Sequence, residues 1–162
     1  MSLRIERIEL YDLVLPLAEP FISAGGGMRE RRSVVVLLQD GEGAVGYGES
    51  PPFELPFYSD ETLAGARGLI ERVLAPRLLH VGFDDAAGVD AVLRPGIRGN
   101  PFARAAIETA AWDLEADRRG VGLAQLVAER VGETAASDVP CGVALGIPED
   151  HEPDTLTRWV RH

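Results

Sequence analysis

The sequence predicts an α+β fold, in which a three-stranded antiparallel meander is followed by a bundle of helices. Two observations lead to this prediction. Up to about residue 50, apolar and β-branched residues alternate with polar ones or form short runs, whereas from residue 59 onward apolar residues recur at helical spacing. Strands followed by a run of helices are typical of the α+β class.

The first strand is expected over residues 4–15. Ile8, Leu10 and Val14 fall on one face of it, and Pro16 is expected to end it. Three consecutive glycines then predict a mobile loop within residues 19–31, because a glycine run favours no regular element.

The second and third strands are expected to form a hairpin. Residues 33–40 are an apolar, β-branched run, Asp40-Gly41 is a turn signal, and residues 44–50 continue as the third strand. The stretch from Gly41 to Gly46 also matches the G-x-G-x-x-G pattern of dinucleotide-binding loops, but that loop needs a helix directly after it. Because a strand is expected there, we interpret the pattern as part of the hairpin.

Two helices are expected after the meander. Ser59 is the predicted N-cap of the first, which has Glu61 in its first turn and ends at Pro76. A second, weaker helix is expected over residues 84–93, before Pro95.

A long helix is expected from Asn100, its predicted N-cap, to Gly120, just past its end, with Pro101 in the first helical position. Its apolar stripe consists of Ala103, Ile107, Ala110 and Leu114, widened by Phe102, Ala106 and Ala111.

The same helix carries the carboxylates Glu108, Asp113, Glu115 and Asp117, which raise the question of catalysis. Charged helical faces are usually solvated, so we interpret all of them as structural. Asp113 lies beside the apolar stripe, where it can be buried with a hydrogen-bond partner. Asp117, Arg118 and Arg119 are expected in the exposed last turn.

The C-terminal part predicts a helix over residues 123–131, a strand over 139–147 and a further helix that begins in 148–162. The predicted strand is too uniformly apolar to be half solvated. An apolar patch on the last helix consists of Leu156, Trp159 and Val160.

Composition excludes several classes of function. The chain has 16 basic and 26 acidic residues and a net charge of −10, which disfavours nucleic acids and anionic lipid surfaces. It has no apolar run of the ~18 to 20 residues that a membrane helix needs and no signal-peptide pattern, so a cytoplasmic location is expected. Every basic residue is arginine, so lysine general-base and Schiff-base chemistry cannot come from this chain.

Isolated ligand-type residues are interpreted as structural. Cys141 is the only cysteine and is expected to be a small buried residue. His151, Glu152 and Asp154 are of metal-ligating types, but they surround Pro153 at an expected helix start, where polar residues are favoured. His80, between two apolar residues, is expected to be packed.

Several phrases of the sequence resemble the N-terminal part of the enolase superfamily. They are RIERIELYDLVLPL, GYGESPPFELPFYSDETLAGA, RGNPFARAAIETAAWDLEADRRGVGLAQLV and VPCGVALGI, which together span nearly the whole chain. The third contains the signature R-x-N-x-x-A-R-x-A-x-E-x-A-x-W-D-L. The chain is most similar to the muconate-lactonizing subgroup, and the Y-x-x-E-T segment at Tyr58 to Thr62 favours its o-succinylbenzoate synthases and N-acylamino acid racemases.

The resemblance implies an enzyme in two parts. Residues 1–136 would form an enolase-like N-terminal capping domain, and residues 137–162 would begin a modified TIM barrel whose remainder is absent. In such enzymes a lysine removes the proton next to a substrate carboxylate, and one Mg²⁺ stabilises the resulting enolate. The lysine pair and the three carboxylate metal ligands belong to later barrel strands, so this chain is expected to hold no catalytic residue or metal ligand and to be inactive alone. A full-length member would be a homo-oligomer acting on a small-molecule carboxylate.

The resemblance also implies a lid over the barrel. The loop at 21–28 and the segment 52–58 would close over the barrel mouth and shape the pocket for the distal group of the substrate. The residues expected to contact the substrate are Phe21, Ser23, Met28, Phe53, Phe57 and Ala144. Relatives often have serine at the position of Ala144, so this departure puts the acyl contact in doubt.

Three functional hypotheses stay open at this point. The first is the N-terminal part of an o-succinylbenzoate synthase, which catalyses a dehydration in menaquinone biosynthesis, or of an N-acylamino acid racemase. The second is another reaction on the same scaffold, muconate cycloisomerisation or dipeptide epimerisation. The third is a non-catalytic binding or assembly module, whose lone barrel strand would need a partner chain to cover it.

Overall fold

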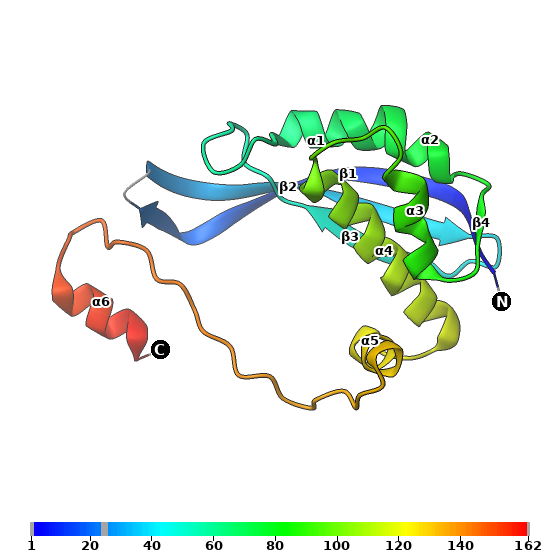
Figure 1. Ribbon diagram of the computed structural model, residues 1–162. Helices are drawn as coiled ribbons and strands as arrows, with labels where there is room; N and C mark the ends of the chain where they lie inside the picture. Colours follow the sequence, from blue (N-terminus) through cyan, green and yellow to red (C-terminus); the bar gives the residue numbers. More distant parts are fainter. Residues whose placement is uncertain (1, 24–25, 162) are drawn as a thin grey trace. The chain divides into compact units, whose positions relative to one another are not determined.

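The computed structural model describes residues 2–23 and 26–161, which form two compact units. Unit 1 consists of Met1–Leu13 and Arg32–Ala136, and unit 2 consists of Val14–Arg31 and Ser137–His162. Strands and helices are both present, and the expected α+β class is confirmed (Figure 1).

One sheet contains four strands in the order β3-β2-β1-β4: β1 (Leu3–Ser23), β2 (Gly26–Asp40), β3 (Val45–Ser50) and β4 (Gly82–Phe83). The three expected strands are confirmed, and the antiparallel β2–β3 hairpin pairs Val36 with Gly48 and Leu38 with Gly46. β4 was not expected from the sequence. It contains only two residues, which pair with Leu3 and Arg4 of β1 and are too few to leave a pattern.

The expected end of the first strand at Pro16 and the mobile loop expected within residues 19–31 are both wrong. β1 continues through Pro16 to Ser23, and β2 begins at Gly26; Ala24 and Gly25 lie outside the described residues. In the described sheet, the pairing on the β4 side of β1 ends at Ile5, which bridges to Leu79, so at Pro16 a missing N–H donor costs no ladder hydrogen bond.

The hairpin turn depends on Asp40. One of its carboxylate oxygens, Oδ1, accepts hydrogen bonds from the backbone N–H groups of Glu42 and Ala44, both at 2.9 Å. The stretch from Gly41 to Gly46 is therefore part of a hairpin, as interpreted. The other oxygen, Oδ2, lies 3.2 Å from Nε of Arg118, whose side chain is only 12% exposed. The expectation that Arg118 is exposed is wrong, because the end of its helix lies against this turn.

The first helical segment begins and ends later than expected. It consists of α1 (Leu63–Leu69), a π-helical stretch (Ile70–Leu74) and α2 (Ala75–Leu78). Its N-cap is Thr62 rather than Ser59, and the Thr62 hydroxyl oxygen accepts the N–H of Gly65 at 3.1 Å. Pro76 does not end the helix, since the π-helical stretch directly before it widens the turn that receives a residue without an N–H.

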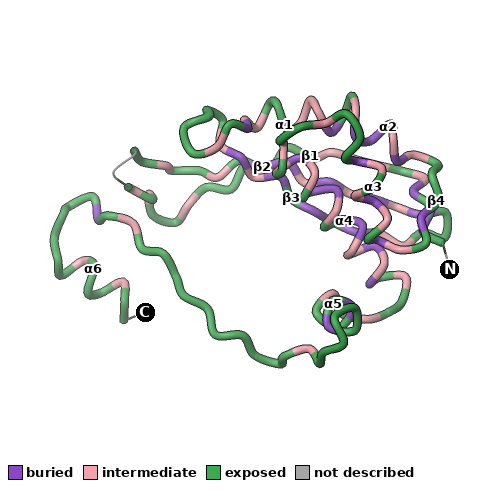
Figure 2. The backbone as a smooth tube through the Cα atoms, in the orientation of Figure 1, coloured by how far each residue is buried: buried purple, intermediate pink, exposed green. Residues whose placement is uncertain are grey.

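The remaining helices follow the sequence closely. They are a 3₁₀ turn (Ala86–Gly88), α3 (Val89–Leu93), α4 (Pro101–Arg119), α5 (Leu123–Val131) and α6 (Pro153–Val160). α4 ends at Gly120 in the left-handed conformation, with φ of 62°. Its expected apolar stripe is buried except for Phe102, which is half-buried (Figure 2).

Unit 1 is built on a close approach between α4 and β3. A Cβ atom on Gly48 would lie 1.9 Å from the carbonyl oxygen of Ala106, and one on Gly46 would lie 2.1 Å from that of Ala110. The two backbones are therefore in direct contact, and only glycine fits at these positions. We call this contact the glycine seam. Behind it, Val34, Val36 and Leu38 of β2 are fully buried.

Carboxylates of α4 complete the edge of the sheet. Asp113 accepts the N–H of Tyr47 at 2.8 Å, and Asp117 accepts that of Val45 at 2.9 Å. Since β3 is the last strand of the sheet on this side, these bonds occupy donors that would otherwise form an open edge. Glu115 accepts the N–H of Ala86 at 2.8 Å. The structural interpretation of these three carboxylates is thus supported.

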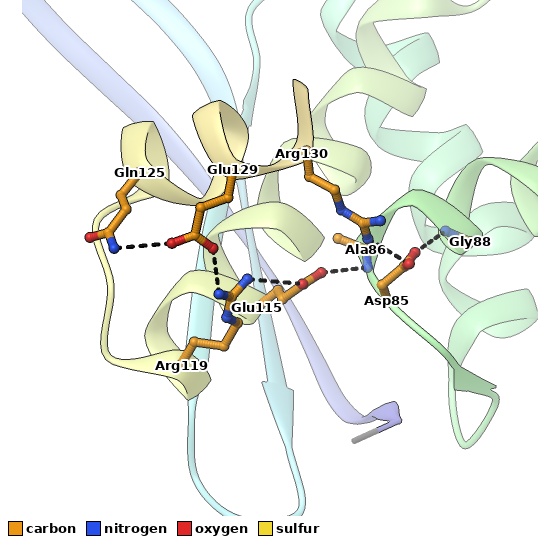
Figure 3. Close-up of polar contacts among 8 residues, drawn as sticks. All are labelled: Asp85, Ala86, Gly88, Glu115, Arg119, Gln125, Glu129 and Arg130. Atoms are coloured by element: carbon orange, nitrogen blue, oxygen red, sulfur yellow. Dashed lines mark hydrogen bonds and ion pairs between the residues drawn. The ribbon is translucent and has the colours of Figure 1, made fainter. Parts of the chain in front are cut away.

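Polar contacts fasten α5 to the rest of unit 1 (Figure 3). Glu129 pairs with Arg119 of α4 at 2.5 Å, and Arg130 pairs with Asp85 at 2.5 Å. The Arg130 guanidinium also lies 5.5 Å from the centre of the Trp112 ring. Leu126 is the one fully buried large side chain of α5, and the ion pairs add to the attachment that its burial provides.

Three further expectations are wrong. Residues 139–147 are assigned to no strand, and Cys141 in this segment is exposed rather than buried. The segment's one backbone hydrogen bond to a described strand comes from Ile147, and Val139 and Val143 are 76% and 82% exposed. His80 is exposed, and its Nδ1 lies 2.8 Å from a carboxylate oxygen of Glu6.

The glycine seam predicts the effect of one methyl group. Gly48→Ala places a Cβ atom inside the van der Waals radius of the α4 backbone, so we expect it to destabilise the fold by at least about 3 kcal/mol. Gly68→Ala is the matched control: its Cβ meets nothing within 4 Å in a helix, and it should stabilise by about 0.5–1 kcal/mol. Urea unfolding followed by circular dichroism measures both, and a wild-type midpoint for Gly48→Ala would rule out the seam.

Acid is expected to loosen α5. The hydrogen bond from Arg130 lowers the pKa of Asp85, and those from Arg119 and Gln125 lower the pKa of Glu129. A carboxyl group whose pKa is lowered by folding contributes stability above its ordinary pKa of about 4, and this contribution is lost as the pH falls through the lowered value. Below about pH 4, amide hydrogen exchange corrected for intrinsic rates should therefore rise in α5 more than in α4.

The control is the double variant Asp85→Asn, Glu129→Gln. It should show faster exchange in α5 already at neutral pH and no further selective rise in acid. Equal responses of α5 and α4 to acid in the unaltered chain would contradict the role of these ion pairs.

Candidate functional site

The segment that follows β3 presents a cluster of aromatic side chains. We call residues 52–58 the aromatic loop. The ring centroids of Phe53 and Phe57 are 4.7 Å apart with planes tilted by 32°, and Tyr58 meets Phe53 edge-on at 6.0 Å. The two expected residues Phe53 and Phe57 are thus brought together in unit 1. Tyr58 was not among the expected contacts, although its place next to Phe57 was a signal in the sequence.

The aromatic loop exposes most of its apolar surface. Phe57 is 67% and Tyr58 77% exposed, and Leu55 is 69% exposed. Phe53 is half-buried and Pro52 buried, so the loop has an anchored base and an open tip. A contiguous exposed apolar cluster of this kind is typical of a surface that contacts a ligand or another part of a protein.

Glu61 connects the return of this segment to the start of α4. Its two carboxylate oxygens accept the N–H groups of Phe102 at 2.7 Å and Ala103 at 3.1 Å, and the residue is only 4% exposed. Asn100 occupies the N-cap position with φ of 54°, but its side chain donates to the Arg98 carbonyl instead of capping. The expected roles of Glu61 and Asn100 are therefore corrected: Glu61 is not in the first turn of its own helix and caps α4 from a distance.

Unit 2 holds the other expected residues. Phe21 and Ser23 end β1, Met28 lies near the start of β2, and the Ser23 hydroxyl donates to the Gly26 carbonyl at 3.2 Å. The C-terminal segment contacts this hairpin, because the Ile147 N–H donates to the Ile22 carbonyl at 2.7 Å.

Ala144 lies in the same segment and is exposed. Two residues later, a Cβ on Gly146 would lie 3.3 Å from the Phe21 ring. Unit 2 therefore brings the segment that carries Ala144 to the part of the hairpin that carries Phe21.

Metal-ligating side chains do not gather in the described residues. Within 2–23 and 26–161, no group of three or more His, Cys, Asp or Glu side chains is placed to hold a metal ion. The acidic stretch before α6 has a local structural role: Asp150 accepts the Thr155 hydroxyl at 2.7 Å and the Glu152 N–H at 3.0 Å, and these bonds lower the pKa of Asp150. A Mg²⁺ ion would need ligands from outside this set.

A cavity of about 390 Å³ lies elsewhere in unit 1, lined by Leu3, Asp84, Glu115, Arg118 and Arg119. Both of its guanidinium groups already pair with carboxylates, Arg118 with Asp40 and Arg119 with Glu129. The cavity therefore offers a ligand little uncompensated charge. None of the described helices is long and apolar enough to cross a membrane.

Known proteins that are similar in sequence to this chain include members of one enzyme superfamily. Residues 7–128 match the family described as the mandelate racemase / muconate lactonizing enzyme N-terminal domain. The chain is 40% identical over 160 residues to an N-succinylamino acid racemase of Thermus thermophilus, with 99% of this chain and 41% of the relative covered. It is 34% identical to an o-succinylbenzoate synthase of Enterococcus faecalis, with 91% and 39% covered, so it spans about two fifths of the length of these curated relatives.

Relatives of lower identity include a muconate cycloisomerase and a solved structure that contains magnesium. A muconate cycloisomerase of Acinetobacter lwoffii is 30% identical, with 88% of this chain and 37% of the relative covered. Among solved structures, a putative mandelate racemase/muconate lactonizing enzyme of Roseovarius nubinhibens, complexed with magnesium, is 27% identical with a TM-score of 0.68, covering 78% of this chain and 34% of that one.

The structural match extends over almost the whole chain. An unknown member of the enolase superfamily from Enterococcus faecalis superposes with a TM-score of 0.79 at 34% identity, covering 99% of this chain and 42% of that chain. The residues that match the family model, 7–128, include both the glycine seam and α4. The chain therefore belongs to the mandelate racemase / muconate lactonizing enzyme N-terminal domain family of the enolase superfamily.

Proposed function

We propose that this chain supplies the lid of an enolase-superfamily enzyme with o-succinylbenzoate synthase or N-succinylamino acid racemase activity. The observation that carries the proposal is the exposed ring cluster of Phe53, Phe57 and Tyr58, held on an anchored loop in a chain similar to enzymes of both names. Residues 1–136 would form the capping domain and residues 137–162 the start of the barrel. The complete enzyme would act in the cytoplasm as a homo-oligomer.

The proposed substrate contacts are Phe21, Ser23, Met28, Phe53, Phe57 and Ala144. The apolar rings would exclude water from the pocket and pack against the distal group of a small carboxylate. Ser23 would add a hydroxyl, although in this structure it donates to Gly26. The methyl side chain of Ala144 has no hydrogen-bond donor, so it would leave space rather than hold an acyl oxygen.

Proton transfer would depend on groups supplied by the rest of the barrel. A bound Mg²⁺ supplies the charge that stabilises an enolate oxyanion, and the described residues gather no ligands for it. Arginine cannot replace the lysine base, because its pKa is too high for proton abstraction at neutral pH. The contribution of this chain is to position the substrate and exclude water.

Muconate cycloisomerisation is the second candidate, favoured by the 30% identity to the Acinetobacter lwoffii enzyme. We rank muconate cycloisomerisation second because the identity to the racemase is higher, 40%. Dipeptide epimerisation and a non-catalytic assembly module stay alternatives.

An exchange assay tests the proposed racemase activity. The gene product that contains this chain together with a complete barrel should exchange the α-proton of an N-succinylamino acid with D₂O in the presence of Mg²⁺, as measured by proton NMR. The 162-residue chain alone should show no exchange, since it has no lysine. Exchange by the chain alone would overturn the proposal, and muconate turnover without α-proton exchange by the longer protein would select the second candidate.

The aromatic loop predicts a binding defect. In the longer protein, Phe57→Ala should raise KM roughly tenfold, the factor expected from losing a ring contact of about 1.5 kcal/mol, and should change kcat less. Leu55→Ala is the matched control, because Leu55 is equally exposed on the same loop but lies outside the ring cluster. Equal KM values for the two variants would remove Phe57 from the substrate contacts.

A further inference from the structure

The aromatic loop is fixed differently at its two ends. At the start, Ser50 ends β3 fully buried, and Pro52 is buried as well. From Phe53 to Asp60, no residue reaches full burial. Glu61 is the first buried residue on the return, and it is polar. The return end is therefore fixed by a carboxylate rather than by apolar packing.

The hydrogen bonds of Glu61 lie close in sequence to residues that are linked to the ring cluster. Both carboxylate oxygens bind backbone N–H groups in the first turn of α4, where a negative charge is favoured by the helix dipole. Tyr58 lies three residues before Glu61. The Phe53 carbonyl accepts the N–H of Leu63, two residues after Glu61, at 2.9 Å. Members of the ring cluster are thus tied to the chain on both sides of this one carboxylate.

We propose that Glu61 is a positioning residue for the aromatic loop: by binding the first turn of α4, it sets the orientation of Phe53, Phe57 and Tyr58. The use of these rings on a substrate rests on the proposed function. Their orientation does not, and it is measurable in the 162-residue chain without any substrate.

Two other contacts lie close to Glu61 on the return end of the segment, and a long, half-exposed ion pair from Glu54 to Arg32 of β2 lies near its start, with the two charged groups 3.6 Å apart. Thr62 caps only its own helix through Gly65, and the Ser59 hydroxyl donates at 3.3 Å to the Glu61 carbonyl within the same segment. Neither reaches α4. The contacts of Glu61 with Phe102 and Ala103 span 41 and 42 residues of sequence and attach the return end to a different helix.

Fluorine NMR of the chain labelled with 3-fluorotyrosine tests the proposal. The sequence has three tyrosines, Tyr11, Tyr47 and Tyr58, which single Tyr→Phe variants assign. Glu61→Gln keeps the size of the side chain but points an amide donor at one of the two N–H groups. We expect it to move the Tyr58 signal toward its position in the urea-unfolded chain, and to speed amide exchange of Leu63 at least about tenfold, as for the loss of one buried hydrogen bond.

The matched control is Asp113→Asn, in the same helix. Asp113 accepts the N–H of Tyr47, so this variant should move the Tyr47 signal and leave that of Tyr58 in place. A Tyr58 signal unchanged by Glu61→Gln, or moved equally by both variants, would overturn the proposal and leave Glu61 as a helix cap only.

A second variant covers the case in which Glu61→Gln does not fold. Glu61→Asp keeps the charge but shortens the reach by one methylene, so it should move the Tyr58 signal in the same direction by a smaller amount. An unmoved Tyr58 signal in a folded Glu61→Asp chain would again overturn the proposal. Failure of the exchange assay in the longer protein would count against the proposed function alone.

Discussion

The direct contact between the backbones of α4 and β3 determines most of unit 1. Gly46 and Gly48 have no side chain on the face that meets α4, so the carbonyl groups of Ala106 and Ala110 lie where Cβ atoms would otherwise be. A helix placed this close can reach the edge of the strand with short side chains. Asp113 and Asp117 then bind the outward N–H groups of β3, and Arg118 reaches the hairpin turn at Asp40.

The contact between α4 and β3 also determines the positions of the two ends of the aromatic loop. β3 ends at Ser50, where the loop begins, and α4 begins at Pro101, where Glu61 receives the end of the loop. Both ends are therefore fixed to one pair of packed elements. A rigid base with an exposed apolar tip suits a lid, because only the tip must adapt to a ligand.

Much of this was readable in the sequence. The β2–β3 hairpin, α4 from Pro101 to Arg119 and α5 from Leu123 to Val131 follow from local turn signals and helical spacing. The wrong predictions concern residues whose structure depends on contacts with parts of the chain far away in the sequence. Glu61 has the pattern of a first-turn acid, and only the position of α4 shows that it caps another helix. The run at 139–147 has the composition of a strand, but a strand also needs a neighbour to pair with. For the site, Phe53 and Phe57 are both expected substrate contacts, and the structure brings their rings together, whereas no local pattern indicates the contact of Glu61 with α4.

The glycine seam can be tested most directly by proton NMR of the labelled chain. If the two backbones touch, the Hα protons of Gly46 and Gly48 should show nuclear Overhauser effects to backbone and Cβ protons of Ala106, Ala110 and Leu114. Effects from these glycines only to neighbouring strand protons, with none to α4, would mean that the helix is not seated on β3, and the account of the sheet edge and the aromatic loop would fail with it.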